Sequence, residues 1–192
     1  MSQGVIMSAI TYFEKPGPDN TDKTLGLAAD RAKELDIETI VLASSSGATA
    51  QKAVKIFPKG SLVVVTHSTG FERKDMQEML PERREELEKV GCRVLTCQHA
   101  FGGVNRAVRR MLHTYQLDEI VAYTLRTMGQ GFKVSLEIAC MAADAGLVSV
   151  KKEALCIAGT GTGADTAVVL TPANAQGFFE LKVHEIVCKP RL

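Results

Sequence analysis

The sequence predicts an α/β protein of three layers, with helices on both faces of a sheet that is parallel at its centre. Short apolar runs alternate with helical segments along the chain, which is the pattern of such sheets. Runs such as Leu62–Val65 are apolar at every position, as expected for strands covered on both faces. With 192 residues, 45% of them hydrophobic, the chain has the size of a single domain, residues 1–192.

The first half of the chain alternates strands and helices in short units. Val5–Phe13 is β-prone and ends before a proline-rich turn, and a helix begins near Thr21 with apolar residues on one face. The elements expected next are a strand at Thr39–Ala43, a helix at Ala48–Phe57 and a strand at Leu62–Val65.

The second half of the chain is richer in helices. We expect helices at Pro81–Val90, from Gly102 to Leu112, and twice within Leu117–Leu147, where Met128–Gly131 interrupts the pattern. The remaining strands are expected at Arg93–Cys97, Ala154–Ala158, Thr166–Thr171 and Leu181–Cys188, the last of them at an edge of the sheet.

Composition excludes several classes of partner. The formal net charge of +1 argues against nucleic-acid binding, which needs a basic face. No apolar run reaches the roughly 18–20 residues that span a bilayer, and the N-terminus lacks the features of a signal peptide, so no membrane partner is expected. Five cysteines without a CxxC pair indicate reduced thiols in a cytoplasmic protein, and no metal site is expected.

A loop rich in hydroxyl groups follows the predicted strand at Thr39–Ala43 and precedes a helix. The first N–H groups of a helix have no partners and its dipole favours negative charge, so this loop predicts a phosphate site. A helix cap is the simpler alternative, but a cap needs only one side-chain oxygen. The residues expected to contact the phosphate are Ser44, Ser45, Ser46, Gly47 and Thr49.

A glycine-rich loop follows the predicted strand at Ala154–Ala158. Its GxGxG spacing is not the GxGxxG dinucleotide fingerprint, and a flexible turn is the alternative interpretation. Because ligands bind beyond the carboxyl ends of parallel strands, this loop is expected to meet the hydroxyl loop at one site. Its candidate ligand-binding residues are Gly159, Thr160, Gly161, Thr162 and Gly163.

Two further groups complete the predicted site. His67 and Gly70 leave a buried strand, and His67 could bind a phosphate or act as an acid or base, although a loop histidine without a role is the alternative. His99 is a weaker candidate of the same kind. A polar group at the start of a helix suits an anion or the polar edge of a flavin, unless its charges pair with Glu137 or Asp144. Its members are Arg126, Gln130, Gly131 and Lys133.

The stretch Ile40–Thr66 resembles the carboxy-terminal domain of pyruvate kinases. The matching features are the Ser45-Ser46-Gly47-Ala48-Thr49 loop, Ala53-Val54, Phe57-Pro58 and Val63-Val64-Val65-Thr66, and the resemblance resumes at Ala154–Val169. In many pyruvate kinases these two loops hold a phosphorylated sugar. No counterpart of the kinase catalytic domain is present, so we expect no kinase activity, and residues from about 98 to 146 look like a helical insertion.

The chain is more similar still to small stand-alone proteins built on that domain. The matching segments are Tyr12–Gly17, Asn20-Thr21, Thr124–Arg126, Gly129–Val134 and Met141–Gly146. This resemblance implies a mixed five-stranded sheet with one antiparallel strand, and it associates the family with flavin mononucleotide (FMN).

The sequence therefore predicts a protein that binds a phosphorylated small molecule, with FMN as the first candidate cofactor. A sugar-phosphate sensor without redox chemistry is one alternative, and an isomerase or lyase with His67 as its base is another. A homo-oligomer is expected, and no residue is assigned a catalytic role by the sequence itself.

Overall fold

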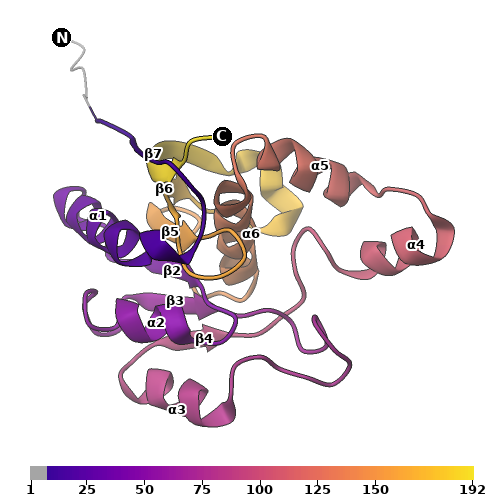
Figure 1. Ribbon diagram of the computed structural model, residues 1–192, viewed down its shortest axis with the longest axis horizontal. Helices are drawn as coiled ribbons and strands as arrows, with labels where there is room; N and C mark the ends of the chain where they lie inside the picture. Colours follow the sequence, from indigo (N-terminus) through magenta and orange to yellow (C-terminus); the bar gives the residue numbers. More distant parts are fainter. Residues whose placement is uncertain (1–7) are drawn as a thin grey trace.

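A computed structural model describes residues 8–192 and contains one sheet of seven strands in the order β1-β7-β6-β5-β2-β3-β4 (Figure 1). Every adjacent pair is parallel except those made by β6, which runs antiparallel to both β5 and β7. The strands are β1 (Thr11–Phe13), β2 (Ile40–Ala43), β3 (Leu62–Val65), β4 (Arg93–Leu95), β5 (Ala154–Ala158), β6 (Thr166–Thr171) and β7 (Lys182–Pro190).

The helices lie between and around these strands. They are α1 (Thr21–Glu34), α2 (Ala48–Ala53), α3 (Pro81–Lys89), α4 (Val104–Leu112), α5 (Leu117–Arg126) and α6 (Gln130–Asp144), with short 3-10 turns at Pro18–Asn20 and Ala175–Glu180. The helix predicted at Ala48–Phe57 is shorter than expected, because its regular part ends at Ala53 and a turn follows.

The sheet confirms the predicted fold class and corrects two details. It is mixed, parallel at its centre and has one antiparallel strand, but seven strands replace the five that the family resemblance implied. Three-residue strands, β1 and β4, extend it at each edge. The prediction that the last strand lies at an edge is wrong, because β1 pairs with Cys188, Lys189 and Pro190 and covers it. The predicted strand residues before position 8 lie outside the described residues.

Two apolar layers hold the three-layer arrangement together. On one face, residues of α1, α2 and α3 form one apolar cluster with Ile40 and Leu42 of β2. On the other, α6 packs on Val41 of the same strand. Successive residues of a strand point to opposite faces, so a strand that is apolar throughout serves both layers.

Helix α6 forms a large part of the second layer, whereas α4 and α5 project from the body (Figure 1). Twelve residues of α6 are buried, and they pack against β2, β3, β5 and β6. None of the nine residues of α4 is buried. Within residues 8–192, no helix has both the length and the apolar character that a bilayer crossing requires.

Candidate functional site

A cleft of about 500 Å³ opens beyond the carboxyl ends of β2, β3 and β5. Loops leaving these three strands line it, and α5 and α6 close its other side. Of the residues predicted for the site, the structure brings together Ser44, Ser45, Ser46, Thr49, His67, Arg126, Gln130, Lys133, Gly159, Gly161, Thr162 and Gly163. Four predicted residues are not among those lining the cleft, namely Gly47, Gly70, Thr160 and Gly131.

The hydroxyl loop, most of which lines this cleft, carries backbone N–H groups without a protein acceptor among residues 8–192. Ser44 Oγ accepts a hydrogen bond from the backbone N–H of Ala50 at 3.3 Å, so one serine performs the capping role. Within residues 8–192, the five backbone N–H groups from Ser45 to Thr49 donate to no protein acceptor. Helix α2 has only six residues, so its dipole contributes little. The loop is suited to an anion mainly because these N–H groups can donate hydrogen bonds to it.

Gly47 supports the loop from behind. Its φ of +85° lies in the left-handed region, and a Cβ there would meet Arg83 Cδ at 2.6 Å. The side of Gly47 on which a Cβ would lie therefore faces Arg83 of α3 and not the cleft. Gly47 was expected to contact the phosphate, but it does not line the cleft, and its positive φ gives the loop a backbone conformation that favours glycine.

The glycine-rich loop is folded tightly around a buried carboxylate. Asp165, fully buried, accepts hydrogen bonds from Gly17 N at 3.0 Å, Thr160 N at 3.2 Å and the Thr166 hydroxyl at 2.8 Å. A Cβ on Gly159 would lie 2.5 Å from the carbonyl oxygen of Gly163. The loop thus has a defined shape, and Thr160 contributes to that shape instead of lining the cleft.

Gly131 and Gly70 also have structural roles outside the cleft lining. A Cβ on Gly131 would lie 2.2 Å from Thr166 Oγ1, so glycine lets the start of α6 approach β6. Gly70 has a φ of +82°, and its N–H donates to the carbonyl oxygen of Met76 at 2.9 Å. Both glycines shape the backbone that carries neighbouring site residues.

Aromatic rings form one wall of the cleft. Phe71 stacks on His99 with a centroid distance of 4.8 Å and an interplanar angle of 14°, and it lies 4.1 Å from the ring of His67. The guanidinium of Arg106, from α4, sits 4.8 Å from the centroid of Phe71. These planar groups create an apolar surface with a positive charge at its border.

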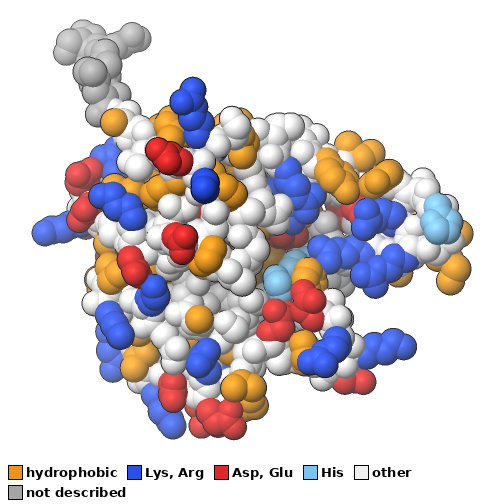
Figure 2. Space-filling model, in the orientation of Figure 1, with side chains coloured by type: hydrophobic (Ala, Val, Ile, Leu, Met, Phe, Trp, Pro, Cys, Tyr) orange, Lys and Arg blue, Asp and Glu red, His pale blue; other side chains and the backbone are white. Residues whose placement is uncertain are grey.

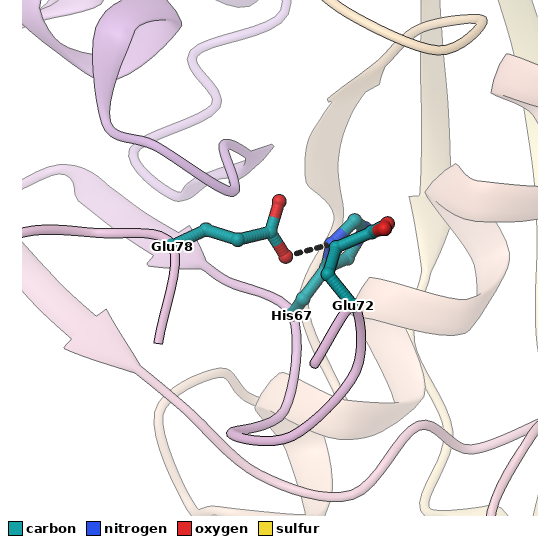
Figure 3. Close-up of side chains that lie close together, drawn as sticks. All are labelled: His67, Glu72 and Glu78. Carbon is teal, nitrogen blue, oxygen red and sulfur yellow. Dashed lines mark hydrogen bonds and ion pairs between the residues drawn. The ribbon is translucent and has the colours of Figure 1, made fainter. Parts of the chain in front are cut away.

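His67 is held by a carboxylate. Its Nδ1 lies 2.6 Å from Glu78 Oε2, and Figure 3 shows the Glu78 side chain reaching the imidazole ring beside Glu72. One potential ligand atom from each of these three residues lies within 4.8 Å of the others. No metal site was expected from the sequence, so these three residues form a candidate group that the sequence motifs did not indicate.

Buried charges at the base of the cleft compensate one another. Lys133 Nζ and a Glu137 carboxylate oxygen form a close ion pair on α6, and both side chains are buried. Burial alone would raise the pKa of Glu137, but neighbouring His99 and the Lys133 ammonium lower it to about 2. Burial lowers the pKa of Lys133, and the Glu137 charge opposes that shift.

The alternative of internal ion pairing therefore holds for Lys133 but not for its neighbours. Arg126 Nε donates to Gln130 Oε1 at 2.7 Å, while Asp144 accepts hydrogen bonds from Asn174 and Ala175. On the face of the molecule shown in Figure 2, histidine side chains lie between acidic side chains and Lys or Arg side chains.

Comparison with known families gives this geometry a context. A family model described as "Pyruvate kinase, alpha/beta domain" matches residues 22–170 of the 192-residue chain. The chain belongs to the pyruvate kinase alpha/beta domain family. The match includes the hydroxyl loop and most of the sheet, and it confirms the resemblance that the loop and strand motifs indicated.

Several cleft residues were absent from the predicted site. Arg106, Phe71 and Glu72 line it, and Glu137 lies at its base. His99, rated below His67 from the sequence, is buried and receives the Ser68 N–H at 3.4 Å. The signal for His99 was its place after a strand, whereas Glu72 and Glu78 follow no periodic pattern that could single them out.

Proposed function

We propose that this protein binds a phosphorylated small molecule in the cleft, and that FMN is its ligand. The observation that carries the proposal is the run of unpaired N–H groups from Ser45 to Thr49 beside the Ser45, Ser46 and Thr49 side chains. Such donors suit the oxygens of a phosphate dianion. The cleft volume of about 500 Å³ lies in the range of cofactor sites.

The remaining walls are compatible with the rest of a flavin. Phe71 and His67 line the same cleft and are only partly buried, so they offer aromatic surface that a ring system can contact. Arg126 and Gln130 are polar groups in the same cleft, suited to ring carbonyl oxygens. Electron transfer would then be the chemistry of the cofactor, and the protein would bind and orient it.

The direct test is an absorbance spectrum of the freshly purified protein from about 350 to 500 nm, where flavins absorb. Titration with FMN and riboflavin should follow on flavin-free protein. We expect FMN to bind much more tightly, because riboflavin lacks the phosphate. Equal affinity for both, or no binding of either, would contradict the proposal.

A sugar-phosphate sensor would use the same phosphate contacts, so a binding measurement has to distinguish FMN from a phosphosugar as the ligand. Thermal unfolding with a panel of phosphosugars distinguishes the two functions. A ligand at 100 times its dissociation constant stabilises the folded state by about 2.7 kcal/mol. Stabilisation by a phosphosugar but not by FMN would favour the sensor.

A second candidate function is proton transfer on a phosphorylated carbonyl compound, with His67 as the base. The Glu78 carboxylate at 2.6 Å from Nδ1 favours it, because this pairing orients an imidazole and leaves Nε2 to react. Incorporation of solvent deuterium into a phosphorylated ketose would test it. Exchange that persists in His67→Ala would eliminate this role.

A further inference from the structure

We propose that His67, Glu72 and Glu78 bind a first-row divalent cation at the rim of the cleft. The three side chains offer one nitrogen and two oxygen ligand atoms, all within 4.8 Å of one another. Two ligand atoms of one such ion lie roughly 3 Å apart, so Glu72 has to move closer. His67 Nδ1 and Glu78 Oε2, which are 2.6 Å apart, have to separate as the ion replaces their hydrogen bond. Glu72 is exposed and Glu78 is on a loop, so both side chains can make these movements.

The loop that carries the three residues is fixed in the fold. His67 lies two residues beyond the end of β3, and its carbonyl oxygen accepts a hydrogen bond from Gln77 Nε2 at 3.0 Å. The Gly70 N–H donates to the Met76 carbonyl oxygen at 2.9 Å, which closes the turn that contains Glu72. These contacts bring residues separated by eleven positions to one point, as Figure 3 shows.

Charge in the cleft gives an independent reason for a cation. His67 and Glu72 line the cleft that, by the proposed function, receives a phosphate dianion. Unscreened carboxylates beside a phosphate repel it, since like charges in a partly buried cleft are weakly screened. Lys133 is already neutralised by Glu137. A divalent cation at the triad would remove the repulsion and offer a coordination position to an oxygen of the bound anion.

The ligand types identify the class of ion. Imidazole suits zinc and other first-row transition ions, whereas carboxylates also suit manganese, and an all-oxygen set would instead favour magnesium or calcium. One histidine and two carboxylates therefore point to Mn²⁺ or Zn²⁺. Three protein ligands leave positions open for water or a ligand oxygen, as in metal sites that bind substrates.

The test uses the metal alone and does not depend on any phosphorylated ligand. Mn²⁺ is titrated into chelator-treated protein, with free ion followed by electron paramagnetic resonance and heat by calorimetry. We expect saturable binding of one Mn²⁺ per chain, competed by Zn²⁺. Glu72→Gln and Glu78→Gln should each weaken it by about tenfold or more, while the exposed Glu82→Gln on α3 should leave it unchanged.

Three results would overturn the cation site. The first is the absence of saturable binding at millimolar Mn²⁺ by the unaltered protein. The second is unchanged affinity in Glu72→Gln, a variant of an exposed residue that is expected to fold normally. Bound Mn²⁺ in His67→Asn with full affinity would likewise exclude the imidazole as a ligand.

The link to the proposed function is measured separately. FMN affinity is determined with and without Mn²⁺, and we expect tighter binding with Mn²⁺ in the unaltered protein but not in Glu72→Gln. By linkage, FMN should raise Mn²⁺ affinity by the same factor. If Mn²⁺ binds and FMN does not, the cation site stands and the flavin proposal fails. A ligated His67 would also be unable to act as the base of the second candidate function.

Discussion

Lys133 and Glu137 form a buried ion pair one helical turn apart on α6, at the base of the cleft. The Glu137 carboxylate also accepts the backbone N–H of Phe101 at 3.1 Å, and His99 Nδ1 lies 3.9 Å from it. A single carboxylate therefore joins α6 to the segment that leads from β4 to the projecting α4. This makes Glu137 the point where the wall of the cleft is attached to the core.

Replacing Glu137 by Gln should destabilise the protein by about 3–5 kcal/mol, because a buried Lys133 ammonium loses its counter-charge. Urea denaturation followed by circular dichroism measures the change in the free energy of unfolding. The matched control is Glu85→Gln, since Glu85 pairs with Lys89 at 3.7 Å on an exposed face. We expect less than about 1 kcal/mol for that control.

The double variant Lys133→Met with Glu137→Leu should recover most of this loss. Apolar side chains of similar volume replace both charges, and no uncompensated charge remains buried. A double variant as unstable as Glu137→Gln would show that the contact with Phe101 N, and not the charge balance, dominates.

The ion pair should also make stability depend on pH in the acid range. The pKa of Glu137 falls from 4.5 to about 2 on folding, so ionised Glu137 favours the folded state. Its contribution is present above about pH 5 and is lost as pH falls toward 2, by about 3 kcal/mol in total. Unfolding free energies from pH 7 to pH 2 measure it, and Glu137→Gln should lack this part of the decline.

Two glycines in helices should respond in opposite directions to alanine. A Cβ on Gly131 would meet Thr166 Oγ1 at 2.2 Å and Asp165 Oδ1 at 2.9 Å, whereas a Cβ on Gly26 in α1 meets nothing within 4 Å. Gly131→Ala should therefore cost about 1–3 kcal/mol. Gly26→Ala should stabilise by about 0.5–1 kcal/mol, because alanine loses less backbone freedom on folding. Thermal unfolding measures both, and equal shifts would contradict the packing argument.

Apolar patterning was sufficient to predict the layers and the edge of the sheet at which the cleft lies. Runs such as Ile40–Ala43 contribute side chains to the apolar clusters on both faces of the sheet. Parallel strands bring the loops that follow them to one edge of the sheet. The place of β7 was not predictable in this way, because its first three residues, Lys182–His184, are exposed. Its buried part begins at Val187, next to Cys188, where pairing with β1 starts.

The acidic residues at the cleft could not be predicted from the spacing of residues along the sequence. Glu72 and Glu78 lie between β3 and α3, in a segment without helix or strand, so no periodicity marks them. Their position is fixed by contacts such as Gln77 with the His67 carbonyl. Glu137 was named from the sequence as an alternative partner for the polar group at the start of α6, in an ion pair between helices. The pair with Lys133 forms instead within α6, where residues four apart face one another.

The last prediction separates the hydroxyl loop's role in binding from its role in folding. Gly47 and Gly60 have nearly the same left-handed φ, +85° and +86°. Valine at either position should therefore cost at least about 1–2 kcal/mol of backbone strain. At Gly47 a Cβ would also press on Arg83, a flexible side chain, whereas at Gly60 it has open space.

Gly47 lies in the loop whose neighbouring residues, Ser46 and Ala48, line the cleft, while Gly60 lies in the turn before β3. FMN titration at 10 °C, with folding verified by circular dichroism, should thus show a large loss of affinity in Gly47→Val and little change in Gly60→Val. If Gly47→Val folds and still binds FMN with normal affinity, binding of the phosphate does not depend on the conformation of this turn. If both variants are folded and lose FMN affinity equally, the loss comes from backbone strain that spreads through the sheet and not from a change in the Ser45–Thr49 loop.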